Sequence, residues 1–213
     1  MLILPAEFRG VISQDARGKY FSKNPLKPRL LDAFFKNLFM MIYARGKPNS
    51  ILEVGCGEGI AGYLIKHEFA GLEYVGSDIR MSHLRAARNI VGKELVGANG
   101  MNLPFPDKSF DMVLFLEVFE HVEGWGKVLA EGLRVARKSV IFSVPAYPWY
   151  QLSNLVFGNN IRRLGENHDH INQFSREDLK VGKEFLFSDI SQTVFKISYV
   201  KFSYPWLISQ IDL

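Results

Sequence analysis

The stretch Ile51-Leu-Glu-Val-Gly-Cys-Gly-Glu-Gly-Ile60 decides the fold. It opens with an apolar, partly β-branched run, which is typical of a strand buried on both faces. Gly55, Gly57 and Gly59 then alternate, and residues without a Cβ allow positive φ and let a ligand approach the backbone. Helical spacing follows, so a helix is expected to begin at Ile60 and to direct free N–H groups at the turn. This arrangement suits an anionic or carboxylate-bearing ligand.

The glycine turn also has a simpler interpretation, a tight bend that only connects a strand to a helix. Three alternating glycines favour a cofactor loop. The segment 57–62 matches G-x-G-x-x-G, but a dinucleotide fingerprint normally begins at the first glycine after the strand, which here is Gly55. Cys56 is either a nucleophile or a small residue in a turn whose backbone binds, and we favour the second. Glu53, inside the strand, requires donors or a cation nearby.

The length of 213 residues suits one domain. We expect a single domain over 1–213, in which 1–48 form an N-terminal arm and helix. Residues 49–145 would form a cofactor-binding core, and 146–213 a substrate-side insertion and the last strands.

Composition narrows the class of protein. The single cysteine excludes an internal disulfide, and no signal peptide or transmembrane segment is evident, so we expect a cytoplasmic protein. Residues 1–50 carry nine Lys or Arg against three Asp or Glu, which attracts anions. Dense basic clusters with interleaved aromatics are missing, so we do not expect nucleic acid as a partner.

The N-terminal part divides into two segments. Residues 1–28 are expected to be irregular, and Arg17-Gly-Lys-Tyr-Phe21 within them is either a lid over a pocket or an arm packed on the surface. Residues 29–45 show a broad apolar stripe at helical spacing. We expect this stripe to pack in the core rather than to form a groove for an apolar substrate or a membrane surface.

Strands and helices alternate up to residue 145. Strands are expected at 73–77, 94–98, 111–116 and 139–144, and helices at 60–68, 81–91 and 125–136. This order implies an α/β fold with a doubly wound, mostly parallel sheet. Ligands of such sheets bind at the carboxyl ends of the strands, where the glycine turn, Asp78, Asn99 and Glu117 are expected to meet.

Asp78 ends the second strand about twenty residues after the glycine turn. An acid at this point can accept hydrogen bonds from both hydroxyls of a ribose. The alternative role is to cap the helix that begins near residue 81. We favour the ribose role because of the glycine turn upstream.

Four linked motifs resemble those of the class I S-adenosylmethionine-dependent methyltransferases, in particular the type 11 group related to ubiquinone and menaquinone biosynthesis methyltransferases. The motifs are residues 51–59, Val75-Gly-Ser-Asp78, residues 103–111 and Leu116-Glu-Val-Phe-Glu-His121. The resemblance implies a Rossmann-like seven-stranded sheet with an N-terminal helical segment and a C-terminal antiparallel strand. It also implies S-adenosylmethionine as cofactor and methyl transfer to a small-molecule acceptor by in-line displacement.

The resemblance implies two groups of cofactor contacts. On the methionine side, Glu53 would support the turn or bind the amino group, and the turn backbone would face the cofactor at Gly55, Cys56, Gly57 and Gly59. On the adenosine side, Asp78 would bind the ribose and Ile79 the adenine. Asn99 stands where the family usually carries Asp, and its side-chain oxygen is the same kind of acceptor with less charge. The other implied contacts are Gly100 and Met101 at the adenine, and Leu116 and Glu117 beside the transferable methyl.

The segment after Pro145 is expected to hold the acceptor. His121, His168 and His170 are weak candidates for a catalytic base. His168 and His170 could instead bind a metal with Asp169, but the spacing matches no strong metal motif, so we expect no metal site.

The C-terminal part also carries structural signals. Ser175 to Asp178 resembles a capping box and is expected to start a short helix, and residues 192–202 alternate like a final antiparallel strand. The segment 135–139 is shorter than in the family, so a tight turn is expected there.

Two other functions stay open at this point. One is a methyltransferase that acts on nucleic acid or protein. The other is a NAD-binding oxidoreductase, which depends on the shifted glycine match.

Overall fold

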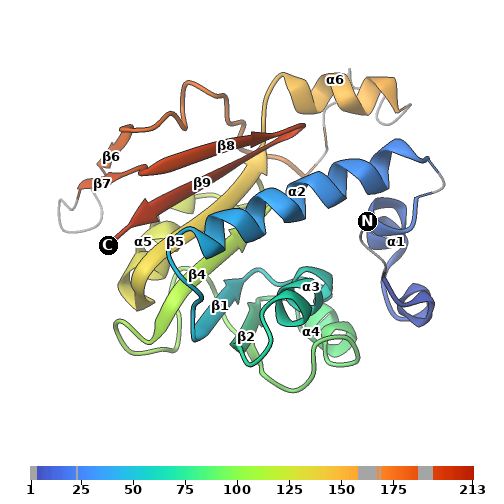
Figure 1. The fold of residues 1–213 in the computed structure, drawn as a ribbon, viewed down its shortest axis with the longest axis horizontal. Helices are drawn as coiled ribbons and strands as arrows, with labels where there is room; N and C mark the ends of the chain where they lie inside the picture. Colours follow the sequence, from blue (N-terminus) through green and yellow to red (C-terminus); the bar gives the residue numbers. More distant parts are fainter. Residues whose placement is uncertain (1–3, 23, 158–166, 168, 187–193) are drawn as a thin grey trace.

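The computed structural model describes residues 4–22, 24–157, 167, 169–186 and 194–213 (Figure 1). Its centre is a seven-stranded mixed sheet in the order β3-β2-β1-β4-β5-β9-β8. The first five strands are parallel, and β9 pairs antiparallel with both of its neighbours, β5 and β8. The strands are β1 (Ser50–Val54), β2 (Glu73–Asp78), β3 (Leu95–Gly97), β4 (Phe110–Leu116), β5 (Ala136–Pro145), β8 (Tyr199–Ser203) and β9 (Trp206–Asp212).

Helices cover both faces of the sheet, as Figure 1 shows. One face packs against α2 (Leu26–Tyr43), α3 (Ile60–Glu68) and α4 (Met81–Ala87), and the other against α5 (Trp125–Val135). Shorter helices are η1 (Ala6–Gly10), α1 (Gln14–Tyr20), η2 (Phe119–His121) and α6 (Trp149–Val156). A separate hairpin pairs β6 (Glu184–Leu186) with β7 (Val194–Lys196).

The burial of β1 and α2 explains why these segments fold as they do. Every residue of β1 is buried, and successive side chains alternate between the faces, with Ile51 in one core and Leu52 in the other. The apolar stripe of α2 is buried at Leu31, Phe34, Phe35 and Leu38. The predicted doubly wound α/β sheet and the core role of the stripe are therefore confirmed.

The N-terminal segment is more ordered than the sequence indicated. The expectation that 1–28 are irregular was wrong, because the described part holds η1 and α1 and α2 already begins at Leu26. The signal that we missed is Ser13, whose hydroxyl accepts a hydrogen bond of 3.2 Å from the Ala16 N–H and so caps α1.

The C-terminal strand assignment also needs a correction. Residues 192–202 do not form one strand: the described part divides into β7 and β8, and the final strand is β9. The backbone changes partner between them, since the Ile197 N–H bonds to Lys183 O whereas the Ser198 N–H bonds to Gln210 O. We missed β9 because no glycine marks the turn before it.

One predicted helix is shorter than expected, and another is only a turn. The helix predicted at 81–91 ends at Ala87. Ser175 and Asp178 exchange the reciprocal bonds of a capping box, with Asp178 N–H to Ser175 Oγ at 3.3 Å and Ser175 N–H to Asp178 Oδ2 at 2.8 Å, but they close only a turn. The tight connection predicted at 135–139 is confirmed, because β5 starts directly after the last residue of α5.

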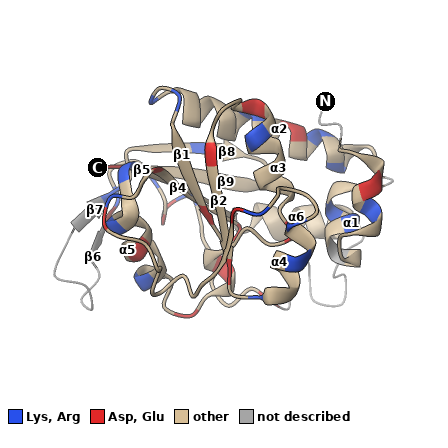
Figure 2. Ribbon diagram, turned by 90° about the horizontal axis from the view of Figure 1, so that it is seen from below, with Lys and Arg blue, Asp and Glu red and all other residues tan. Residues whose placement is uncertain are grey.

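The N-terminal helices carry charges of both signs. Figure 2 shows basic and acidic positions interspersed on α1 and α2. In the part of the chain that the structure describes, no helix combines the length and apolar character needed to cross a membrane.

Candidate active site

The predicted site lies where the strand order reverses. β1 and β4 are neighbours, and the chain continues from β1 toward β2 on one side and from β4 toward β5 on the other. The glycine turn follows β1 and Glu117 follows β4. The crevice beyond these two strand ends is the place where open α/β sheets bind ligands.

The glycine turn adopts the positive-φ conformation that its sequence predicts. The φ angles of Gly55, Gly57 and Gly59 are 77°, 54° and 85°. The N–H groups of Gly55 and Cys56 both donate to the Ser77 carbonyl, at 2.7 and 2.9 Å, which ties the turn to β2. A Cβ added to Gly57 would meet no atom within 4 Å. This face of the turn is open, as backbone binding of a ligand requires.

Asp78 connects the turn to the next helix. Its carboxylate accepts hydrogen bonds from the Gly57 N–H at 2.9 Å and from the Arg80 N–H, at the start of α4, at 2.8 Å. Arg80 directly precedes α4, and no side chain among the described residues caps this helix, so the bond closes the turn before the helix and the capping role considered from sequence is not observed. His83 Nδ1 also lies 3.4 Å from Asp78 Oδ2. A carboxylate has about four lone-pair sites, so these three contacts leave acceptor capacity for a ligand.

Glu53 lies beneath the turn rather than in the open crevice. Glu53 and Tyr74 are each 2% exposed, and the Tyr74 hydroxyl donates to Glu53 Oε2 at 2.6 Å. Burial raises the pKa of Glu53 to about 7, although the Tyr74 hydrogen bond opposes the shift. Cys56 is also buried, which raises the pKa of its thiol. A thiol that stays protonated is a poor nucleophile, in agreement with the structural role that we favoured.

The positions expected at the adenine lie along the ends of β2 and β3. Ile79 is 68% exposed, an unusual position for an isoleucine and a suitable one for contact with a flat ring. The Asn99 side-chain oxygen accepts a hydrogen bond of 3.0 Å from the Met101 N–H. The acceptor that we assigned to the adenine amino group thus also stabilises the turn at Gly100, which packs against Val128.

An arginine that sequence reasoning missed fixes the loop after β3. Arg134 donates to the carbonyls of Leu103 and Phe105 at 3.1 and 2.9 Å and pairs with Asp107 and Glu131. Glu131 in turn accepts from the Leu103 N–H at 2.8 Å. The i, i+3 spacing of Glu131 and Arg134 was the only signal for it.

Glu117 lies at the carboxyl end of β4 with a positive φ of 59°, which is rare for a residue with a side chain. Its two oxygens accept hydrogen bonds from Ser143 Oγ at 3.1 Å and from Trp206 Nε1 at 2.7 Å. Burial raises the pKa of Glu117, while the charge of Lys19 and these hydrogen bonds oppose the shift. Trp206 was not foreseen because β9 was missed. Leu116, before Glu117, is half-buried.

The N-terminal helix α1 reaches over this crevice. The Glu58 carboxylate of the glycine turn accepts the Ser13 N–H through both oxygens, at 2.9 and 3.1 Å. Burial lowers the pKa of Lys19, but Tyr20 and Glu117 outweigh burial, and the net shift is upward. The contact with the turn is made by Ser13, before 17–21, so both roles considered for 17–21 stay open.

Two of the three candidate histidines are described, and they are in contact. The rings of His121 and His170 lie 4.9 Å apart. His170 stacks on Tyr150 at 5.3 Å, and its Nδ1 is 2.9 Å from the Tyr147 hydroxyl. Burial, followed by the nearby His121, lowers the pKa of His170 to about 4, so its imidazole is neutral at physiological pH. His168 lies outside the described residues.

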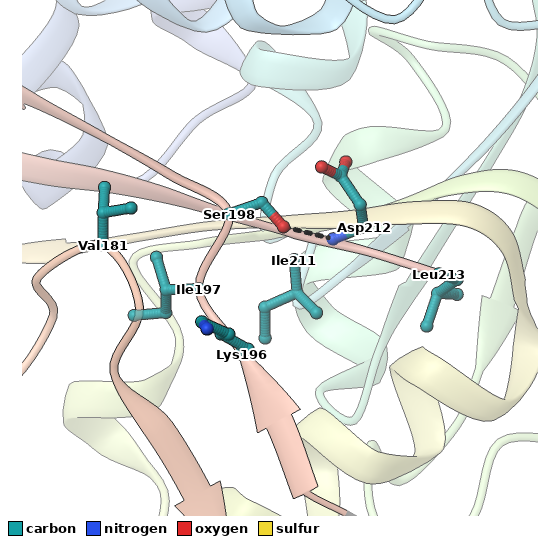
Figure 3. A pocket seen from close by; sticks show the side chains of 7 residues that line it. All are labelled: Val181, Lys196, Ile197, Ser198, Ile211, Asp212 and Leu213. Atoms are coloured by element: carbon teal, nitrogen blue, oxygen red, sulfur yellow. Dashed lines mark hydrogen bonds between the residues drawn. The ribbon is translucent and has the colours of Figure 1, made fainter.

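The molecule also has recesses away from this edge. One, of about 540 Å³, is lined by residues of β7 and β9 and their flanks, including Lys196 and Leu213 (Figure 3). It lies beside the end of β9 that pairs with the start of β5, away from the carboxyl edge. A second, of about 750 Å³, lies between α2 and α3. Neither is lined by a predicted cofactor residue.

Comparison with known proteins identifies this architecture. A protein of Pyrococcus horikoshii OT3 has a TM-score of 0.62 at 17% identity, with 98% of this chain and 99% of that chain covered. Magnesium protoporphyrin IX methyltransferase from Synechocystis PCC 6803, solved with bound SAH, has a TM-score of 0.63 at 16% identity, with 96% and 92% covered. The fold, with the glycine turn and Asp78 at the switch point, is therefore the Rossmann-like fold of the class I S-adenosylmethionine-dependent methyltransferases.

The sequence match agrees with this architecture. Residues 52–144 match the type 11 family model, described as a methyltransferase domain. S-adenosylmethionine is its cofactor.

Curated relatives agree over the same region. A fatty-acid O-methyltransferase of Mycolicibacterium smegmatis is 36% identical over 95 residues, which are 43% of this chain and 35% of that protein. A norajmaline N-methyltransferase of Rauvolfia serpentina is 29% identical over 114 residues, 50% of this chain and 39% of that protein. The chain thus spans little more than a third of the length of these relatives.

Proposed function

We propose that the protein transfers the methyl group of S-adenosylmethionine to a small-molecule acceptor by in-line displacement. The observation that carries this proposal is the junction of the glycine turn with Asp78 at the switch point: the open face of Gly57 and the remaining acceptor sites of Asp78 lie together. A methionine carboxylate against the N–H groups of the first turn of α3, which follows the glycine turn at Ile60, and a ribose against Asp78 fit this pair.

The remaining cofactor contacts follow from the same placement. Gly55, Cys56 and Gly59 hold the shape of the turn, and Glu53 supports it from below through Tyr74. The exposed face of Ile79 covers the adenine, and the backbone of Gly100 and Met101 borders it. Asn99 contributes through the turn that it closes. Leu116 and Glu117 border the methyl.

Methyl transfer requires little of the protein beyond positioning the acceptor against the methyl donor. Bound S-adenosylmethionine supplies the methyl on a sulfonium that is already an activated electrophile. The chain aligns the acceptor, which contributes about 7–11 kcal/mol, and excludes water with α1. His170, a weak base, and His121 face the acceptor side and accept a proton only from an acidic hydroxyl or an equivalent group.

A small-molecule acceptor is favoured over a macromolecule. The two curated relatives named above are a fatty-acid O-methyltransferase and a norajmaline N-methyltransferase, and acidic residues interrupt the basic positions on α1 and α2 (Figure 2). We also propose that all segments form one domain, because α2 packs on β8 and β9. A cytoplasmic location is proposed on the single free cysteine.

The test uses S-adenosylmethionine labelled in the methyl group with a cell extract as acceptor. We expect the label in the organic-solvent extract of the reaction. Label in the acid-precipitated protein or RNA would contradict the small-molecule acceptor, and unconsumed donor would contradict methyl transfer itself.

A further inference from the structure

The buried carboxylate of Glu120 needs a cation. Glu120 is 0% exposed, and neither of its carboxylate oxygens has a hydrogen-bond partner among the residues that the structure describes. A buried, unsatisfied carboxylate is strongly unfavourable, so such groups are normally paired or bound to a metal. Burial, and after it the charge of Glu117 three residues earlier in the chain, raise the pKa of Glu120, and a cation beside the carboxyl group would oppose this shift.

Two histidines surround this carboxylate. One carboxylate oxygen of Glu120 and one ring nitrogen each of His121 and His170 lie within 4.8 Å of one another. A tetrahedral cation with bonds of about 2.1 Å holds its ligands about 3.4 Å apart, so side-chain rotations of roughly 1 Å would close the site. His170 would then exchange one of its two hydrogen bonds, Nδ1 with the Tyr147 hydroxyl at 2.9 Å or Nε2 with Asn167 Nδ2 at 3.1 Å, for the bond to the ion. From sequence we considered His168, His170 and Asp169. His168 lies outside the described residues. In the described part of the chain, Glu120 and His121 on η2 lie opposite His170.

The orientation of His121 suits a metal ligand. Its Nδ1 lies 2.9 Å from the Asp169 carbonyl, to which only a protonated nitrogen can bond. The lone pair is then on Nε2, which faces Glu120 Oε1 at 4.0 Å. A histidine whose other nitrogen donates to a carbonyl is the usual arrangement for a ligand, since that bond fixes the tautomer and the ring orientation.

The backbone around the cluster is also fixed. The Ile171 and Asn172 N–H groups donate to the Glu120 carbonyl at 2.8 and 3.2 Å. The Asn172 side chain donates to the carbonyls of Phe119 and Val122 at 2.8 and 2.9 Å. These four bonds attach the segment that carries His170 to η2, so the three ligands are held together by rigid backbone.

We propose that Glu120, His121 and His170 form a binding site for a divalent transition-metal cation such as Zn²⁺ or Co²⁺. One carboxylate and two imidazoles are a ligand set typical of these ions and leave an open coordination position. η2 follows β4 and Glu117 directly, so this position lies on the acceptor side of the crevice.

Metal binding can be measured without any methyl transfer, so its failure is distinct from failure of the proposed function. The untagged chain, freed of metal by a chelator, is titrated with Co²⁺ and followed by calorimetry and by visible absorption. We expect one Co²⁺ per chain with a dissociation constant at or below about 10 μM, and a higher Tm when Zn²⁺ is added, because the ion binds the folded state.

Variants separate this site from adventitious binding. Glu120→Gln, His121→Ala and His170→Ala should each weaken Co²⁺ binding at least tenfold, whereas His67→Ala, an exposed histidine on α3, should not change it. His121 is itself exposed, so His121→Ala is expected to fold even if Glu120→Gln does not. No binding by the parent chain, or equal binding by His121→Ala and His67→Ala, would overturn the proposal.

Discussion

The backbone N–H of Gly57 donates a 2.9 Å hydrogen bond to the Asp78 carboxylate. This bond joins the turn after β1 to the end of β2, across 21 residues of sequence. It places the open face of the glycine turn beside a carboxylate with free acceptor sites. Both groups are therefore oriented before the cofactor arrives.

Asp78→Ala should weaken S-adenosylhomocysteine binding at least tenfold. The substitution removes the ribose acceptor and the partner of the Gly57 N–H. Asp78→Asn is the matched comparison, because it keeps one acceptor oxygen without the charge, and its affinity should be intermediate. Calorimetry measures both, and circular dichroism checks the fold. Unchanged affinity in Asp78→Ala would reject the ribose assignment.

Gly57→Ala should impair cofactor binding, while Gly71→Ala should not. Both glycines have positive φ, 54° and 78°, and an added Cβ meets no atom within 4 Å at either position. The backbone strain is thus similar, about 1–2 kcal/mol, and the two Tm values should fall by similar amounts. Only at Gly57 would the new methyl occupy the ligand's space, with an expected loss of tenfold or more. Equal affinities in the two variants would show that the turn does not contact the cofactor.

Glu53 should make the protein less stable as the pH rises. Its pKa is about 7 in the folded chain, against an ordinary value of 4.5 for a glutamate side chain. The favourable contribution is complete below pH 4.5 and is lost as the pH rises through 7. Over this range the parent chain should lose up to about 3 kcal/mol relative to Glu53→Gln, measured by urea unfolding.

Tyr74→Phe tests the origin of this effect. It removes the donor that opposes the shift, so it should steepen the loss of stability with pH. Parallel pH profiles for the parent and Glu53→Gln would contradict the assignment.

Glu58→Gln should loosen α1. The substitution weakens the charge-assisted bonds from the Ser13 N–H by about 1 kcal/mol. Trypsin should then cut after Arg17 or Lys19 about fivefold faster, because cleavage follows the population of the open form. Glu123→Gln, an exposed acid outside the turn, is the control. If S-adenosylhomocysteine gave no protection from cleavage, α1 would not be a lid over the cofactor.

Local patterns were sufficient to predict the sheet and the strand ends of the site. The structure of residues 51–60 could be predicted for two reasons. A strand that is buried on both faces favours Val and Ile, and a turn with positive φ favours Gly. The same reasoning failed for β9, since a strand of antiparallel type without a glycine turn before it has no distinct signature. For that reason Trp206 and its hydrogen bond to Glu117 were not predicted.

Contacts between distant segments could not be predicted in the same way. Glu120 was visible in the motif that ends at His121, but its lack of a hydrogen-bond partner appears only when η2 and the His170 segment pack together. The bond between Ser13 and Glu58 likewise spans 45 residues. The spacing of residues in the sequence does not indicate such tertiary contacts. The acceptor side depends on them and was therefore the least predictable part of the site.

The most direct test of the central claim is calorimetric titration of the chain with S-adenosylhomocysteine and, separately, with NAD. The account predicts one S-adenosylhomocysteine per chain with a dissociation constant of about 100 μM or below, and no heat from NAD. Binding of NAD without S-adenosylhomocysteine would contradict it.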